Sequence, residues 1–489
     1  MLVRRCASGC AGRVRPAAPR INVPSPARFQ CRRYATPSSG GAGAAASSAP
    51  INGVGALAPI VSELDKMAPS FDVRQQDIQI LETPAEFYET LKGRIRNARR
   101  RIFLSTLYIG KSERDLIDTL HEALRRNPDL QLSILTDALR GTREAPRPSC
   151  ASHHMKLYGV DDEVILSGAN LSTDYFTNRQ DRYHLFSCKQ VTDFFWRLHS
   201  GVASFSFLVE PSAQDAAGFT LTWPSTNTAP SPLDKPQAFV ASTTKLLHGL
   251  LKPSSERAPG PLVDTRVYML GQMSQLLRPD SSTELPVVTR LLEKLAEPTY
   301  RGSSWTFTAG YFNPASSLTK LLLGTASHHN TVITAAPEAN GFYRSRGVSG
   351  MLPDAYVLLA RRFLDGVRRA GRGDHIALKE WRRGTVGQPG GWSYHAKGLW
   401  VTLPGDADPA VTVIGSSNYT RRSYSLDLEA GALVVTRGDA LRRRLGEEQR
   451  WLQEHAREVT RDDFARNDRR VGLHVRVAMW IVQLVGGAL

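Results

Sequence analysis

The chain of 489 residues carries a formal net charge of +16, with 41% hydrophobic and 22% charged residues. This length and composition are those of a globular protein of two or three domains with a sizeable core. The positive charge favours an anionic partner: a phosphate substrate, a nucleic acid or an acidic lipid. After residue 34 only Cys150 and Cys188 remain, which excludes a disulfide framework and a zinc pattern.

The first 34 residues contain eight arginines and no lysine, and the first acidic residue of the chain is Glu63. Arginine-rich, acid-free N-termini are typical of mitochondrial transit peptides, and Arg32-Arg33-Tyr34 resembles a processing site. We therefore expect a mitochondrial protein, on the matrix side of the inner membrane, with a mature charge of +16 − 8 = +8. A disordered basic tail is the alternative. Residues 35–69 are predicted to form a flexible linker.

Helices and strands alternate through residues 70–208, the predicted first domain. Thr83-Pro84-Ala85-Glu86 combines an N-cap, a first-turn proline and a capping-box acid, which indicates a helix start. The predicted elements are a helix over 84–99, a strand over 102–109, a helix over 112–126 and strands over 130–135, 154–158 and 163–167. This alternation predicts a mostly parallel sheet with helices on its faces.

The same alternation returns in residues 241–455, the predicted second domain, after a proline-rich and irregular linker over 209–240. Its predicted elements are strands over 305–312, 331–334, 395–401 and 411–415 and helices over 315–323 and 354–369. The predicted fold class is α/β, with two similar α/β/α domains in a pseudo-two-fold arrangement around one shared site. Residues 456–489 form a basic and then apolar tail, for which membrane contact and a helix docked on the core are the alternatives.

One set of polar residues occurs twice in the same order along the chain. The first set is His154, Lys156, Asn170 and Asp181, and the second set is His395, Lys397, Asn418 and Glu429. A single His-x-Lys carries little information, but two copies with the same followers indicate a duplicated half-site. Residues i and i+2 of a strand point to the same face, so each His and Lys is expected to project together.

These residue types suit the transfer of a phosphoryl group. One histidine attacks phosphorus, and the second protonates the leaving group and later deprotonates the acceptor. The lysines and asparagines hold the non-bridging oxygens, where negative charge develops. Each acid is expected to orient the histidine of its own copy, Asp181 for His154 and Glu429 for His395. No metal ion or other cofactor is required, and no cluster has metal-ligand spacing.

The chain resembles the phospholipase D superfamily, whose hallmark is His-x-Lys-x4-Asp followed by Gly-Ser-x-Asn. Asp161 completes the first motif and belongs to the family's catalytic set, whereas Thr402 occupies its place in the second. Because Asp181 and Glu429 are the better candidates to orient the histidines, we expect Asp161 to be structural. His153 is one residue too far from the lysine, so the motif selects His154.

Longer segments resemble the eukaryotic phosphatidylglycerophosphate synthases over roughly residues 70–455. They are 164–172, 175–183, 337–343, 394–400 and 427–430. The resemblance implies transfer of a phosphatidyl group from CDP-diacylglycerol to sn-glycerol 3-phosphate, with release of CMP. It also implies peripheral contact with an anionic membrane and no nucleic-acid partner. His154 is mapped as the nucleophile and His395 as the acid and base, although the symmetry of the motifs does not decide between them.

Three arginines are weaker candidates for binding substrate phosphates. Arg140 follows a predicted strand end, and Arg179 and Arg182 flank Asp181. A solvated loop and surface ion pairs are the plain alternatives for them. For the whole protein, the alternatives are a phospholipase D-type phosphodiesterase acting on phospholipid or nucleic acid and a non-catalytic scaffold on the membrane. A nucleic-acid enzyme would need an aromatic and basic groove, and the sequence shows no such stripe.

Overall fold

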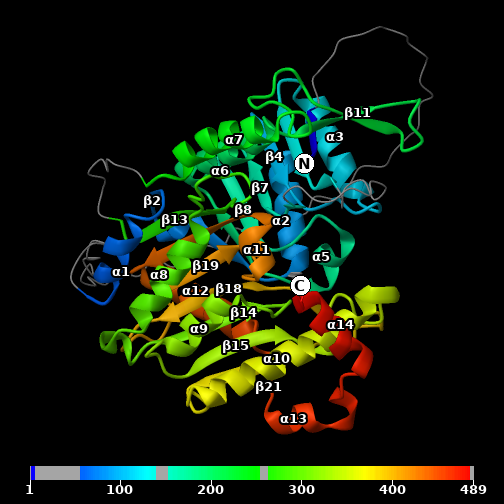
Figure 1. Cartoon of the computed structure of the whole chain (residues 1–489). Coiled ribbons are helices and arrows are strands. Elements are labelled where there is room, and N and C mark those ends of the chain that lie inside the picture. The colour runs from blue at the N-terminus through cyan, green and yellow to red at the C-terminus, as the bar shows by residue number, and fades with distance from the viewer. Residues whose placement is uncertain (1, 6–54, 139–151, 254–262, 485–489) are drawn as a thin grey trace, which may run out of the picture.

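The computed structural model describes residues 2–5, 55–138, 152–253 and 263–484. Arg140, Cys150 and the expected processing site at residues 32–34 lie outside the described residues. The chain folds into two large mixed sheets covered by helices, with helices α6 (Lys189–Ala203) and α7 (Pro236–Leu251) at the top of Figure 1 and α10 (Leu352–Arg369) at the bottom. These α/β layers confirm the predicted fold class.

The first sheet has nine strands, several of them from the predicted first domain. Their spatial order is β12 (Phe219–Thr222), β11 (Phe207–Pro211), β1 (Leu2–Arg5), β5 (Gln131–Thr136), β4 (Arg101–Ser105), β7 (Leu157–Val160), β8 (Glu163–Ser167), β10 (Tyr183–Phe186) and β3 (Ile78–Leu81). Helices α2 (Pro84–Arg96) and α3 (Arg114–Arg126) pack together beside it. Since β1 lies within the expected transit peptide, processing would remove a strand between β5 and β11.

The second sheet has ten strands, nine of them in one continuous order and the tenth, β6 (Ser152–His153), paired with β20 off that order. Their order is β2 (Ser70–Val73), β13 (Thr265–Gln272), β20 (Asp427–Thr436), β19 (Val411–Gly415), β18 (Lys397–Thr402), β14 (Ser304–Ala309), β15 (Asn330–Ala335), β16 (Ile376–Trp381) and β21 (Ala456–Glu458). Its helices are α1 (Leu57–Leu64), α8 (Glu284–Leu295), α9 (Ser316–Gly324), α10, α12 (Asp439–Trp451) and α13 (Arg461–Ala465).

The two sheets repeat one strand order. The run β5-β4-β7-β8-β10-β3 in the first matches β15-β14-β18-β19-β20-β13 in the second. In both runs the strand after each His-x-Lys lies at the centre, next to the strand that leads to Asn170 or Asn418. The repeat places the duplicated residues at equivalent points of the two sheets, and their relation by a pseudo-two-fold axis stays a prediction.

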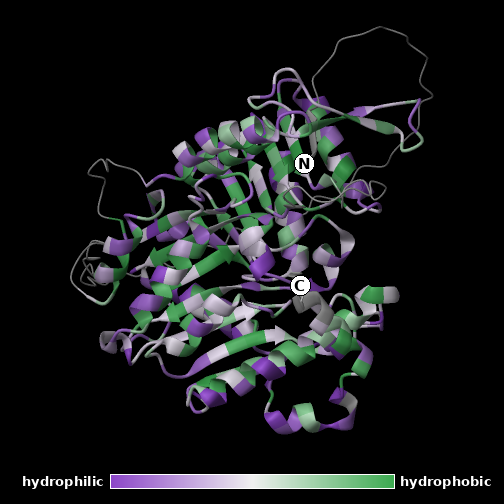
Figure 2. Ribbon diagram, in the orientation of Figure 1, coloured by the Kyte–Doolittle hydropathy of each residue, from purple (hydrophilic) through white to green (hydrophobic). Residues whose placement is uncertain are grey.

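Side chains alternate across each strand and so build separate cores on the two faces of each sheet. In β13, Val267 and Met269 join the core shared by both sheets, while Tyr268 and Leu270 face the outer core beneath α1, α8 and α10. Figure 2 shows the apolar strands in the interior and the polar faces of the helices outside. The shared core ties the two halves together as one body.

Local sequence explains where α2 begins. The Thr83 side chain accepts the Glu86 N–H at 3.1 Å, and the Glu86 carboxylate accepts the Glu82 N–H at 2.7 Å. Pro84 occupies the first turn, where it lacks only a hydrogen bond that the helix would not make. The predicted helix start is confirmed, while its end comes at Arg96 rather than residue 99.

Two predicted linkers contain regular structure. Helix α1 lies within residues 35–69, because Leu57, Ile60, Val61 and Leu64 form an apolar stripe at helical spacing that packs on the second sheet. The region 209–240 contains most of a hairpin of β11 and β12, which extends outward in Figure 1. Strand β2, expected in the first domain, pairs with β13 of the second sheet.

The tail begins with β21 and α13 and ends in helix α14 (Leu473–Leu484), which packs on α10. Among the described residues, no helix combines the length and apolar character needed to cross a membrane.

Candidate active site

Each His-x-Lys follows a short strand that pairs with the opposite half of the molecule. Strand β6 (Ser152–His153) pairs with the start of β20, and His154 N–H donates to the Leu428 carbonyl at 3.0 Å. Strand β17 (Ser393–Tyr394) pairs with β9 (Arg179–Gln180), and His395 N–H donates to the Gln180 carbonyl at 2.8 Å. This backbone pairing carries each histidine across to the other half.

The two histidines therefore exchange their acidic partners. His154 Nδ1 lies 2.8 and 2.9 Å from the two oxygens of Glu429, and His395 Nδ1 lies 2.7 Å from Asp181 Oδ2. The prediction that each acid orients the histidine of its own copy is wrong, because β6 and β17 deliver each histidine to the strand carrying the other copy's acid. Each half-site is thus completed by the opposite half of the chain.

Both histidines line one cavity of about 400 Å³. Its other lining residues are Leu107, Tyr108, Asn170, Asp174, Tyr175, Arg179, Tyr311, Gly341, Phe342, Leu352, Tyr356, Asn418, Thr420, Arg422 and Asp427. Tyr175 and Tyr311 meet the His395 ring edge to face, with ring centres 5.2 and 5.3 Å away. The two histidines of the duplicated motif thus share one cavity, as the expectation of a single site required.

The two lysines lie beneath the histidines rather than on the cavity wall. Lys156 Nζ donates to the His154 carbonyl at 2.6 Å, and Lys397 Nζ donates to the His395 carbonyl at 2.9 Å. Strand β7 begins only at Leu157, so the first His and Lys do not share a strand face as expected. Their ammonium groups supply buried positive charge just behind the imidazoles.

The two asparagines reach the cavity from the ends of β8 and β19. Asn170 Nδ2 donates to the Tyr175 hydroxyl at 3.1 Å, and Asn170 Oδ1 accepts the Leu107 N–H at 3.3 Å. Asn418 Oδ1 is buried and has no hydrogen-bond partner among the described residues. Both amides line the cavity, where they can donate to a phosphate oxygen.

Asp161 has a structural role, as its place outside the duplicated set indicated. It adopts a φ of +52° in the turn between β7 and β8. Its carboxylate accepts the N–H groups of Arg99, Arg100 and Arg101 at 2.9, 2.8 and 3.1 Å. Asp161 therefore fixes the start of β4 and does not contribute to the cavity, so its place in the expected catalytic set is wrong.

Arg182 is a buried tether and not a substrate ligand. Its guanidinium donates to Glu448 at 2.9 and 2.8 Å and lies over the Trp400 ring at 3.8 Å. It has no access to the cavity, which corrects its expected role. The sequence alone does not reveal this, because the partner Glu448 lies on a distant helix, α12.

Arg179 lines the cavity as expected. Its Nε donates to Ser393 Oγ at 2.9 Å, and its guanidinium lies 4.5 Å from the Tyr175 ring centre. It also pairs with Asp174 at 3.1 Å. The Arg179 guanidinium is thus a fixed positive charge in the same cavity as His395, where it can meet a second phosphate group.

Burial controls the protonation of the site. It lowers the pKa of both histidines well below their ordinary value, and the neighbouring lysine charges act in the same direction. It raises the pKa of Asp181 to about 6 and that of Glu429 to about 7, and it lowers the pKa of Lys156 to about 7 and of Lys397 to about 8. A neutral imidazole that donates from Nδ1 leaves the Nε2 lone pair free to attack.

These pKa values give an expected pH dependence. The rate should rise through pH 6–7 as Asp181 and Glu429 ionise, and it should fall from about pH 7 to above pH 8 as Lys156 and then Lys397 lose their protons. Measurement of kcat/KM from pH 5.5 to 9 checks the bell shape, and Glu429→Gln should flatten the acidic limb while lowering the maximum. A profile without either limb would contradict this view of the charges.

The sequence missed several residues of the cavity. Arg422 and Asp427 form an ion pair at 3.1 Å on its wall, and four tyrosines also line it. The only available signal was position, since Asp427 stands two residues before Glu429 and Arg422 follows Asn418 by four.

His154, Asp427 and Glu429 form a cluster of possible metal ligands, because their ligand atoms lie within 4.8 Å of one another. Glu429 already contacts His154 and the Ser416 hydroxyl, so its oxygens are occupied in positioning.

The two His-x-Lys sequences meet in one cavity beside two sheets of the same strand order, as the resemblance to the phospholipase D superfamily leads one to expect. A solved structure of similar fold is the phosphatidylserine synthase of Haemophilus influenzae, with a TM-score of 0.64 and 18% identity over 88% of this chain and 97% of that one. No family model matches the chain.

Similarity to curated proteins is much closer. The chain is 40% identical over 465 residues to the CDP-diacylglycerol–glycerol-3-phosphate 3-phosphatidyltransferase of Saccharomyces cerevisiae, covering 84% of this chain and 88% of the relative. It is 32% identical over 484 residues to the mitochondrial enzyme of the same name from Homo sapiens, covering 85% and 84%. The chain belongs to the family of CDP-diacylglycerol–glycerol-3-phosphate 3-phosphatidyltransferases.

Proposed function

We propose that the protein transfers the phosphatidyl group of CDP-diacylglycerol to sn-glycerol 3-phosphate, giving phosphatidylglycerophosphate and CMP. This reaction is the committed step toward phosphatidylglycerol and cardiolipin. The observation that carries the proposal is the pair of histidines in one cavity, each held by a buried acid of the opposite half. Membership of the transferase family supports the choice of donor and acceptor.

In the first step, His154 Nε2 attacks the phosphorus that carries the diacylglycerol. A P–N bond forms, the P–O bond to CMP breaks, and a phosphatidyl-histidine remains. Glu429 stabilises the positive charge that develops on the imidazole, because it accepts the hydrogen bond of Nδ1. Lys156, Lys397 and the two asparagines offset the charge of the phosphate oxygens. His395 enters this step protonated, with its charge balanced by the Asp181 carboxylate, and gives its Nε2 proton to the departing CMP phosphate, which leaves it neutral for the second step.

In the second step, the glycerol hydroxyl attacks the same phosphorus and its proton passes to His395. The P–N bond breaks and His154 returns to its neutral form. The low pKa of His395 keeps its imidazole neutral and ready to accept a proton at this stage, and Asp181 holds the ring in place. Arg179 binds the phosphate of the acceptor, so it favours glycerol phosphate over water.

The donor is a membrane lipid, so the enzyme works at a bilayer surface that it contacts peripherally. The relatives named as mitochondrial and the arginine-rich N-terminus support a mitochondrial location, on the matrix side of the inner membrane.

The test is release of CMP from CDP-diacylglycerol by the purified full chain in detergent, with and without sn-glycerol 3-phosphate. Release is expected to depend on the acceptor, and Arg179→Lys should raise the acceptor concentration needed for half-maximal rate about tenfold, because it loses the bidentate contact. CMP release that ignores the acceptor would instead identify a hydrolase. Arg125→Lys, an exposed change on α3, is the matched control.

A further inference from the structure

Helix α14 packs on α10 with one face and leaves a second face exposed. Val475 and Met479 are buried against Ala355 of α10. Leu473, Val477 and Trp480 are 72%, 47% and 61% exposed and recur at helical spacing. Three of the seven large exposed hydrophobic side chains among the described residues therefore lie on this short helix.

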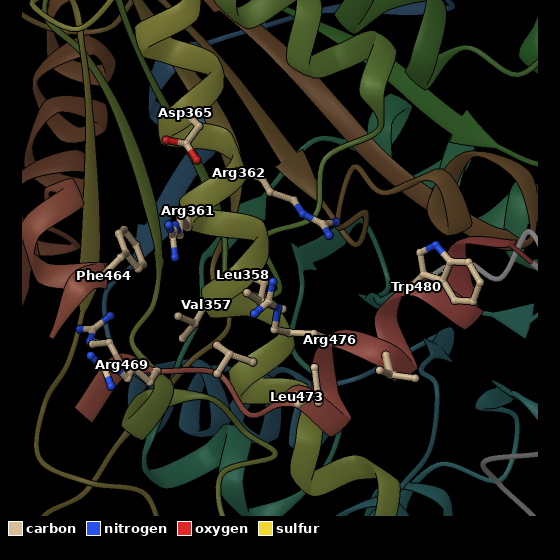
Figure 3. A pocket seen from close by; sticks show the side chains of 13 residues that line it. Val357, Leu358, Arg361, Arg362, Asp365, Phe464, Arg469, Leu473, Arg476 and Trp480 are labelled. Atoms are coloured by element: carbon tan, nitrogen blue, oxygen red, sulfur yellow. The ribbon is translucent and has the colours of Figure 1, made fainter. Parts of the chain in front are cut away.

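Beside this stripe, α10, α13 and α14 enclose a groove of about 780 Å³. Its walls combine apolar side chains with arginines, and Figure 3 shows Arg476 extending from α14 toward α10 and Arg361 on the side of α10 that faces Phe464. Asp365 and Arg469 also line it, but they are held by Arg461 and Glu380. The arginines without a carboxylate partner among the described residues are Arg361, Arg362, Arg470 and Arg476.

The basic surface continues over α10 to its other side. A second hollow of about 770 Å³ shares Arg362 with the groove and is lined by Lys320, Arg369 and Arg421, with no acidic residue in its lining. The N-terminal turn of the same helix supplies Leu352 and Tyr356 to the wall of the active-site cavity. One helix thus joins the catalytic cavity to a surface that carries exposed apolar side chains and arginines.

We propose that this surface, made by the stripe Leu473, Val477 and Trp480 and the arginines Arg361, Arg362, Arg470 and Arg476, docks on a bilayer containing anionic phospholipids. The inference rests on the proposed function, in which the donor is drawn from a membrane. Guanidinium groups bind lipid phosphates, while a tryptophan and aliphatic side chains enter the interface between headgroups and acyl chains. Trp480 is the one aromatic side chain of the stripe, and Leu473 and Val477 beside it offer no stacking surface for successive bases, so the patch suits a lipid surface rather than a nucleic acid.

The placement also explains how a lipid reaches the histidines. The phosphates of the donor must enter the cavity while its acyl chains stay in the bilayer. Docking through α10 and α14 holds the N-terminal end of α10, and with it the cavity wall at Leu352 and Tyr356, close to the membrane. Substrate could then enter without leaving the bilayer completely.

The experiment is flotation of the full chain with two kinds of vesicle. One contains phosphatidylcholine alone, and the other also contains about 30 mol% phosphatidylglycerol, which gives the surface a negative charge like that of an anionic membrane. The variants are Arg361→Gln with Arg476→Gln, and Val477→Ser with Trp480→Ser. Each pair should weaken binding to the anionic vesicles about tenfold or more, and binding of the unchanged protein should fall at high salt. Arg125→Gln with Arg443→Gln, exposed arginines on α3 and α12, is the matched control and should bind normally.

CMP release from detergent-solubilised donor separates this inference from the proposed function. Both variant pairs should keep that activity and lose activity on vesicles. Unchanged flotation by both pairs would overturn the docking surface even if the transferase is active. A change in oligomeric state on sedimentation, with flotation unaltered, would instead assign the stripe to contact between two copies and would also overturn the proposal.

Discussion

Replacing His154 by alanine is expected to lower kcat/KM by about four orders of magnitude or more, because the reaction loses the atom that carries the phosphatidyl group. His395→Ala should also be severely impaired, but for a different reason. It keeps the nucleophile and Glu429, while the second step lacks its base. With a phosphatidyl-labelled donor and no acceptor, His395→Ala should therefore accumulate label on the peptide that contains His154.

The measurement is mass spectrometry of the denatured, digested protein after a single turnover. Label on His395 in the His154→Ala variant, with none on His154 in the reciprocal variant, would reverse the two roles. His121→Ala on the exposed face of α3 is the matched control and should show ordinary turnover without trapped lipid. If both alanine variants turn over normally, a covalent histidine intermediate is excluded.

The sequence was sufficient to predict the repeated sheets and the residues gathered at their centre. Helical and strand periodicity is local, so α2, α3, β8 and β19 appear close to their expected bounds. The duplicated His, Lys and Asn were found because a repeat can be recognised without knowing the fold. His154 was chosen over His153 by spacing alone. In the structure His153 is buried outside the cavity lining, and its ring nitrogens have no hydrogen-bond partner within the part of the chain that the structure describes.

What the sequence did not give depends on contacts between distant segments. The exchange of Asp181 and Glu429 between the histidines follows from the pairing of β6 with β20 and of β17 with β9, strands of two residues that no periodicity reveals. The structural role of Arg182 was missed for the same reason. An arginine next to a catalytic acid is easily interpreted as a phosphate ligand when its buried partner, here Glu448, is not known. Helix α1 was missed because its apolar stripe follows a segment of linker composition.

The tether between Arg182 and Glu448 leads to the second large expected effect. Both side chains are fully buried, and Glu448 also contacts His184 at 2.9 Å and the Trp400 indole at 2.9 Å. Burial alone would raise the pKa of Glu448, but the charges of Arg182 and His184 hold it well below its ordinary value. Its contribution to stability is therefore present above the unfolded pKa near 4 and is lost as the pH falls below that value.

Glu448→Gln should destabilise the protein by about 3–5 kcal/mol, because it leaves the Arg182 guanidinium buried without its counter-charge. Loss of the ion pair between Arg182 and Glu448 should also change the active site. The backbone N–H of Arg182 donates to Asp181 Oδ1 at 2.9 Å, and its guanidinium donates to the Lys397 carbonyl at 3.2 Å, so a shift of Arg182 disturbs both groups beside His395. We expect a lower midpoint of thermal unfolding together with a reduced kcat at temperatures where the variant remains folded.

Glu447→Gln is the matched control, since the neighbouring glutamate is exposed on the same helix, and it should change neither quantity. The double change Arg182→Met with Glu448→Met removes both charges and should recover much of the lost stability, as buried ion pairs replaced by apolar groups often do. Its kcat should stay low, because the guanidinium contact to Lys397 remains absent. Recovery of both stability and kcat in the double variant would mean that Arg182 stabilises the fold without positioning the site.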